Sequence, residues 1–72
     1  MIELDLKGLS CPMPLLKAKL ALNGLNTDDV VAVWATDPGS QRDFAVFCEQ
    51  SGHQLLESSE QNGNFYYRIQ KS

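Results

Sequence analysis

The chain has 72 residues, enough for one small domain over residues 1–72 and too few for two. Six Lys and Arg against nine Asp and Glu give a net charge of −3, which argues against direct binding of nucleic acid, because neutralising phosphates requires basic side chains. No segment approaches the ~18 apolar residues of a membrane-spanning helix, and the acidic N-terminus lacks the apolar stretch of a secretion signal, so we expect a cytoplasmic protein without membrane contact.

The first half of the chain predicts a strand, a helix and a second strand. Apolar and acidic residues alternate with period two in Ile2–Leu6, as in a strand that is buried on one face. From Pro12 the period changes to that of a helix, which ends at Asn23 and Gly24. Its apolar face consists of Leu15, Ala18, Leu22 and Leu25. Val30–Ala35 is a continuous apolar, β-branched run, which is typical of a strand in the middle of a sheet.

The second half begins with a predicted helix. Ser40 and Asp43 have the spacing of a capping box, in which both side chains bond to the backbone at the helix start. The apolar face of this helix consists of Phe44, Phe47 and Cys48. Gly52 is the expected stop.

A β-hairpin is predicted to follow that helix. One strand runs from Leu55 toward Glu60, and Phe65–Ile69 forms the returning strand. Asn62 and Gly63 lie between them and suit a type I′ turn, which requires positive φ at both central positions. The resulting order, β-α-β-α-β-β, predicts a two-layer α/β sandwich with two helices packed on one face of a mixed four-stranded sheet.

The candidate chemistry lies in the segment Cys11-Pro12-Met13-Pro14. Two prolines this close together are tolerated only in the first turn of a helix, where their missing N–H groups have no intrahelical partner, so Pro12 and Pro14 fix the helix start. Cys11 then lies at or beside the N-cap, where the helix dipole is expected to favour the thiolate over the thiol. The alternative is that Cys11 is a small buried residue that fills a turn.

The chain has two cysteines, Cys11 and Cys48, and they make neither a disulfide framework nor a zinc site. Cys48 shares a helix face with Phe44 and Phe47, so we expect it in the core. Cys11 is therefore the candidate nucleophile.

The chain resembles the TusA/SirA-like sulfur-carrier proteins, small domains with a Cys-Pro-x-Pro motif. The resemblance covers nearly the whole chain and includes the closing hairpin. The matching positions are Gly8-Leu9, Cys11-Pro12, Pro14, Asp37-Pro38, Arg42-Asp43, Phe47-Cys48, His53 and Leu55. It implies a β-α-β-α-β-β fold and a cysteine, here Cys11, that carries sulfane sulfur as a persulfide.

The function that this resemblance implies is a sulfur relay through a carrier, rather than a self-contained enzyme. Cys11 accepts sulfur from a donor protein, such as a cysteine desulfurase or a rhodanese, and passes it to a thiol of an acceptor protein. Such a relay needs no metal and no organic cofactor. The recipient pathway, tRNA thiolation or another sulfur or selenium pathway, stays open.

Three further residues are candidates for the rim of the site or for partner contact. Met13 occupies the variable position of the motif, where an acidic residue is common in the carriers that resemble this chain and serve tRNA thiolation. Lys19 either offers positive charge to a partner or lies on a solvated helix face. Asp37 follows the second strand, which we expect to lie beside the first strand, so that its end is near Cys11. The alternative is that Asp37 only stabilises the turn after that strand.

Arg42 and Asp43 are expected to have structural roles, as a helix cap or an ion pair.

The alternative function is a non-catalytic binding or regulatory module with the same fold. Such a module would keep its activity when Cys11 is replaced by Ser, whereas a carrier would lose it, because a hydroxyl cannot hold transferable sulfur.

Overall fold

The computed structural model describes residues 1–72 and contains the six predicted elements in the predicted order. The elements are β1 (Ile2–Leu6), α1 (Met13–Asn23), β2 (Val30–Ala35), α2 (Ser40–Ser51), β3 (Gln54–Gln61) and β4 (Asn64–Gln70). The first helix begins one residue later than expected, because Pro12 is its N-cap rather than its first helical residue. No helix is both long enough and apolar enough to cross a membrane.

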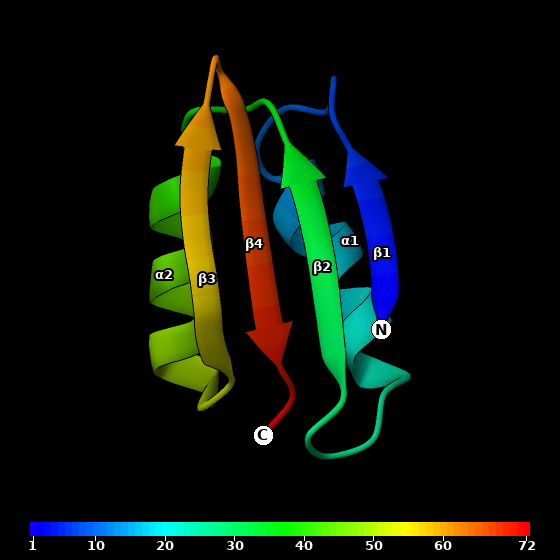
Figure 1. Ribbon diagram of the computed structural model, residues 1–72. Coiled ribbons are helices and arrows are strands. Elements are labelled where there is room, and N and C mark those ends of the chain that lie inside the picture. Colours follow the sequence, from blue (N-terminus) through cyan, green and yellow to red (C-terminus); the bar gives the residue numbers. More distant parts are fainter.

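The four strands form one mixed sheet in the order β1-β2-β4-β3. β1 and β2 are parallel, and β4 is antiparallel to both β2 and β3. Both helices lie on the same face of this sheet (Figure 1). The predicted two-layer α/β sandwich is therefore confirmed.

The core lies between the helices and the sheet and is thin, as the length of the chain implies. Its fully or nearly buried side chains come from both helices and three strands: Leu6, Ala18, Leu22, Val31, Val33, Ala35, Phe44, Cys48, Phe65, Tyr67 and Ile69. Ala18 and Leu22 confirm the predicted face of α1, and Phe44 and Cys48 confirm that of α2. Cys48 is only 5% exposed, so its expected place in the core is also confirmed.

The start of α2 differs from the predicted capping box. Gly39 is the N-cap and no side chain caps the helix, so Ser40 is already the first helical residue. As the first helical residue rather than the N-cap, Ser40 has its side chain facing the sheet. A buried hydroxyl there needs a hydrogen-bond partner. Its Oγ lies 2.7 Å from the hydroxyl oxygen of Tyr67 in β4. The capping-box prediction was wrong because the Ser40 hydroxyl bonds to a buried side chain of the sheet rather than to the backbone at the helix start.

The predicted turn between β3 and β4 is confirmed, since both of its central residues, Asn62 and Gly63, have positive φ values, 55° and 81°. Its tip lies at the same end of the sheet as the starts of both helices (Figure 1). Both chain ends lie toward the opposite end of the sheet, one at the start of β1 and the other beyond the end of β4 (Figure 1).

Candidate functional site

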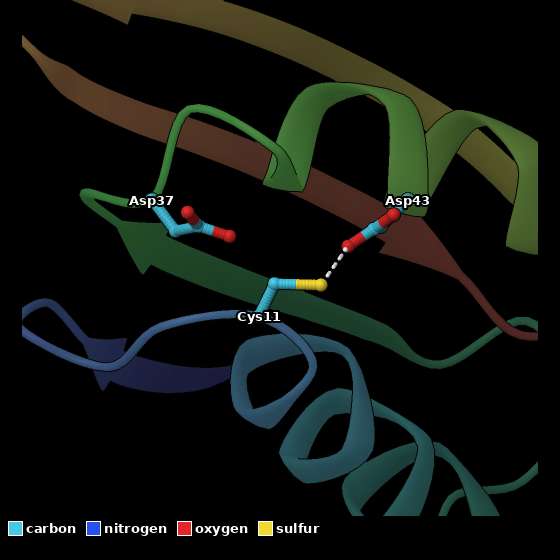
Figure 2. A group of neighbouring side chains, drawn as sticks. All are labelled: Cys11, Asp37 and Asp43. Carbon is cyan, nitrogen blue, oxygen red and sulfur yellow. Dashed lines mark hydrogen bonds between the residues drawn. The ribbon is translucent and has the colours of Figure 1, made fainter.

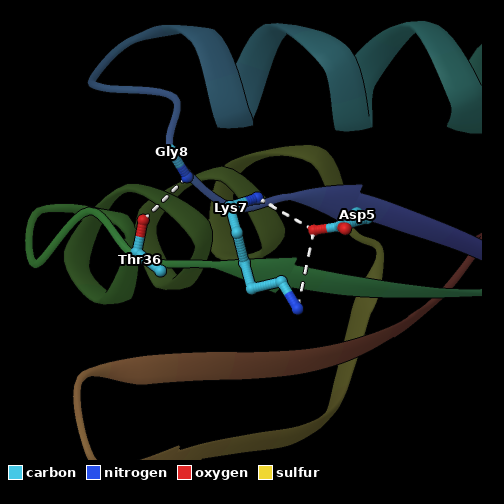
Figure 3. A network of polar contacts seen from close by, with 4 residues as sticks. All are labelled: Asp5, Lys7, Gly8 and Thr36. Atoms are coloured by element: carbon cyan, nitrogen blue, oxygen red, sulfur yellow. Dashed lines mark hydrogen bonds and ion pairs between the residues drawn. The ribbon is translucent and has the colours of Figure 1, made fainter.

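The loop between β1 and α1 carries Cys11 and is tied to the neighbouring strand. β1 and β2 are parallel neighbours, so the loops that follow them leave the sheet at the same edge. The N–H of Gly8 donates a hydrogen bond of 2.9 Å to Oγ1 of Thr36, which directly follows β2 (Figure 3). Gly8 has a φ of +86°, a conformation that residues with a side chain rarely adopt. This bond fixes the path of the loop just ahead of Cys11.

The Cys-Pro-Met-Pro segment forms the junction between this loop and α1. Cys11 is exposed, which contradicts the alternative that it fills a buried turn. Pro12 is the N-cap, after a cis Cys11–Pro12 peptide bond, and Pro14 is buried in the first turn. Met13 is 40% exposed at the first position of the helix. The prolines thus hold an accessible thiol at the very start of α1.

Two carboxylates lie beside this thiol. Sγ of Cys11 donates a hydrogen bond of 3.1 Å to Oδ2 of Asp43, across 32 residues of chain (Figure 2). Asp43 lies in the first turn of α2, and Asp37 lies in the connection between β2 and α2. One donor atom from each of Cys11, Asp37 and Asp43 lies within 4.8 Å of the others. The structure thus brings Asp37 next to Cys11, and it adds Asp43.

The hydrogen bond to Asp43 raises the pKa of the Cys11 thiol above its ordinary value of 9.0, and partial desolvation and the charges of Asp43 and Asp37 raise it further. The expectation that the helix start favours the thiolate is therefore wrong. Pro12 and Pro14 have no N–H, and the N–H of Met13 already donates to the Ser10 carbonyl oxygen at 2.9 Å. Few backbone donors remain to stabilise a thiolate, while two carboxylates oppose it.

The three side chains also make a set of donor atoms of the kind that metal ions accept. A closed zinc site takes four such ligands, one more than this group supplies. One atom of the group, Oδ2 of Asp37, is buried without a hydrogen-bond partner. We assign no ion to the group and describe it as a thiol with two acidic neighbours.

A groove of about 370 Å³ opens between α1 and α2, and Asp43 forms part of its lining. Its lining is part apolar and part charged and consists of Leu15, Lys19, Arg42, Asp43, Val46, Phe47 and Gln50. Nζ of Lys19 lies 5.3 Å from the centre of the Phe47 ring. Lys19 is exposed, and its side chain lines this α1–α2 groove. Asp43 belongs to both the groove and the thiol site.

Sequence reasoning named Cys11 and Asp37 but gave Asp43 only a structural role. No local pattern marks Asp43, because its partner lies 32 residues away. The usable signal is topological: two helices that start at the same edge of a sheet bring their first turns together. Arg42, its neighbour, has no ion-pair partner within 4.0 Å, so the suggested ion pair with Asp43 is absent.

Comparison with known proteins gives consistent matches over the length of the chain. The profile of the TusA family, described as "Sulfurtransferase TusA", matches residues 2–71. The sulfur carrier protein TusA of Allochromatium vinosum is 50% identical over 70 residues, which cover 97% of this chain and 92% of that protein. TusA of Pseudomonas putida is 40% identical over 68 residues, covering 94% and 85%.

A solved structure gives the same result at the level of the fold. The SirA-like protein of Desulfitobacterium hafniense superposes with a TM-score of 0.87 at 33% sequence identity. The match covers 97% of this chain and 96% of that one. The arrangement of helices and strands described above is thus shared with a crystal structure.

Proposed function

This chain belongs to the TusA family of sulfur carriers, and we propose that Cys11 is the residue on which it carries sulfur in a relay between proteins. The observation that supports this role is the contrast between its two thiols. Cys11 is exposed just ahead of α1, whereas Cys48 lies on the buried face of α2. A partner can reach the first thiol and not the second.

Loading is a thiol–persulfide exchange. The Cys11 thiolate attacks the outer sulfur of a donor persulfide, R–S–SH, and the donor's S–S bond breaks with its electron pair on R–S⁻. The products are the Cys11 persulfide and the donor thiol. In unloading, an acceptor thiolate attacks the outer sulfur of Cys11–S–SH, and Cys11 leaves as its thiolate. No electrons are gained or lost overall, so the chain's own residues suffice.

The partners that we propose are a donor protein of the cysteine desulfurase or rhodanese kind and an acceptor protein with a reactive thiol. The site is open rather than enclosed, so the partner supplies the cleft in which transfer takes place. Met13 and Lys19 are the proposed contacts, since Met13 is exposed beside the thiol and Lys19 lies in the adjoining α1–α2 groove. A reducing compartment such as the cytoplasm keeps both thiols free for this chemistry.

Intact-mass measurement tests the proposal. The protein is incubated with a cysteine desulfurase and cysteine, or with a rhodanese and thiosulfate, and each sulfur carried adds about 32 Da as a persulfide. We expect a reducible gain on the native chain and on Cys48→Ser, and none on Cys11→Ser. A native chain that no donor loads would overturn the proposal and favour a binding or regulatory module instead.

A further inference from the structure

We propose that Asp43 is the general acid–base group of Cys11: when Cys11 receives sulfur, its carboxylate takes the thiol proton and passes it to the departing donor thiolate, and when sulfur leaves, it passes the proton of the incoming thiol to Cys11. The contact between Sγ and Oδ2, at 3.1 Å, is the observation from which this inference starts (Figure 2). It rests on the proposed carrier function and assigns a role to a second residue of that site.

Asp43 is suited to this role by its position and by the absence of competing bonds. Its backbone N–H donates to the Gly39 carbonyl oxygen at 3.1 Å, which anchors it in the first turn of α2. Its side chain takes no other hydrogen bond and joins no ion pair. Oδ2 therefore has a free lone pair for the proton, in the distance range required of a general base.

Asp37 differs from Asp43 in its relation to the thiol. It has no hydrogen bond to Cys11 and raises the thiol pKa by its charge alone. Its Oδ2 is buried and has no hydrogen-bond partner. Asp37 therefore sets the local potential, while Asp43 is the group in contact with the reacting sulfur.

Moving the proton within the pair avoids the cost of a second negative charge. With the proton on Sγ, the pair consists of a thiol and a carboxylate; with the proton on Oδ2, it consists of a thiolate and a carboxylic acid. The net charge of the pair is −1 in both states. Release of the proton to solvent would instead leave two anions at hydrogen-bond distance, which is strongly disfavoured.

The proton can be followed through both halves of the relay. In loading, Asp43 takes the proton from Cys11, the thiolate attacks the outer sulfur of R–S–SH, and the departing R–S⁻ takes up a proton from Asp43. In unloading, the incoming thiol R′–SH gives its proton to Asp43 and attacks as R′–S⁻. The departing Cys11 thiolate then recovers that proton, so Asp43 ends each half as a carboxylate.

Other charged groups around the pair affect where it titrates. Asp37 acts on the thiol by its charge from the connection after β2, and Tyr67 in β4 is itself influenced by the charges of Asp37 and Asp43. Arg42 and Lys19 line the α1–α2 groove together with Asp43. Tyr67 is neutral through the physiological range, since burial raises its pKa above 10.0. These groups shift the midpoint of a pH profile in native protein and variants alike, so the test relies on the difference between them.

The test compares two reactions of Cys11 in Asp43→Asn. Alkylation by iodoacetamide needs only the thiolate, whereas transfer from glutathione persulfide also needs a proton for the departing thiol. Removing the carboxylate lowers the thiol pKa, so we expect alkylation at pH 7 to become severalfold faster. We expect single-turnover transfer to become at least about tenfold slower, as for loss of a general acid–base group. Loss of a negative charge also favours approach of this anionic donor, so a slower transfer is not a charge effect.

Matched variants keep this test independent of folding. Glu49→Gln removes the same charge from an exposed site on the same helix and is expected to leave both rates within about twofold, as a distant surface charge should. Asp43→Glu restores a carboxylate and is expected to recover part of the transfer rate. In Asp43→Asn, transfer should follow the titration of the thiol, while in the native protein it should persist at lower pH.

The proposal about Asp43 is overturned if Asp43→Asn transfers sulfur at the native rate, or if both its reactions change in the same direction. The proposed function fails in a different way, namely if Cys11→Ser still gains reducible sulfur. The two failures are thus distinguishable with the same set of proteins.

Discussion

The buried hydrogen bond between Ser40 and Tyr67 makes a quantitative prediction about stability. Ser40 is 1% exposed and Tyr67 is 0% exposed, and each is the other's only protein partner for its hydroxyl. Ser40→Ala and Tyr67→Phe each remove one hydroxyl and leave the rest of the side chain in place. The ring of residue 67 keeps its stacking on Phe44, where the centroids are 4.6 Å apart.

Each single change leaves one buried hydroxyl without a partner, which costs about 1–3 kcal/mol. A mid-range loss of about 2 kcal/mol lowers Tm by about 8–16 °C in a domain of this size. The double variant removes both hydroxyls together and leaves no orphan. We therefore expect it to be destabilised by about 1 kcal/mol, the net worth of one hydrogen bond, rather than by the sum of about 4 kcal/mol, which is a coupling of about 3 kcal/mol.

Urea unfolding followed by far-UV circular dichroism measures the free energy of unfolding of all four proteins. A typical stability of about 4–11 kcal/mol for 72 residues leaves each variant folded in water. Additive losses in the double variant would refute the reasoning, because they would mean that the two hydroxyls do not satisfy each other. A loss below about 0.5 kcal/mol in both single variants would contradict the burial of the pair.

Three further predictions concern the Tyr67 hydroxyl and the loops. Burial raises the pKa of Tyr67 above 10.0, so the native state holds the phenol proton more tightly than the unfolded state does. The resulting contribution to the free energy of unfolding is full below pH 10 and declines as pH rises through the native pKa. In this alkaline range, the free energy of unfolding of Tyr67→Phe should depend less on pH than that of the native protein. Gly63→Ala should cost about 1 kcal/mol because φ is +81°, whereas Gly24→Ala should be neutral or slightly stabilising at φ −89°; equal thermal shifts would disprove this. Thr36→Val should speed amide exchange at Gly8 and cost about 1 kcal/mol, whereas Thr36→Ser should not; identical exchange in both would show that the bond has no effect.

Local patterns were sufficient for most of the fold. Period-two alternation identified Ile2–Leu6, and the apolar run Val30–Ala35 matched β2 residue for residue. Asn62 and Gly63 identified the hairpin because few residue pairs tolerate positive φ at both positions. These signals act within a few residues of chain, so a sequence carries them directly.

The site was predicted less completely because its chemistry depends on contacts between distant segments. The motif identified Cys11, but the state of its thiol depends on Asp43, which lies 32 residues away. A helix start stabilises an anion through its free N–H groups, and Pro12 and Pro14 lack the N–H groups that would stabilise a thiolate here. Ser40 was misread for a related reason, since only the packed sheet reveals that its hydroxyl faces Tyr67.

The position of the two chain ends has a practical consequence for work with this protein. Met1 and Ser72 lie at the end of the sheet opposite to the starts of the helices, and therefore opposite to Cys11 (Figure 1). An affinity tag, a fluorescent label or a tether to a sensor surface can be joined at either end with the thiol pointing away from the attachment. Immobilised protein would thus present Cys11 to soluble partners, and the order in which donor and acceptor engage it can be followed on a single surface.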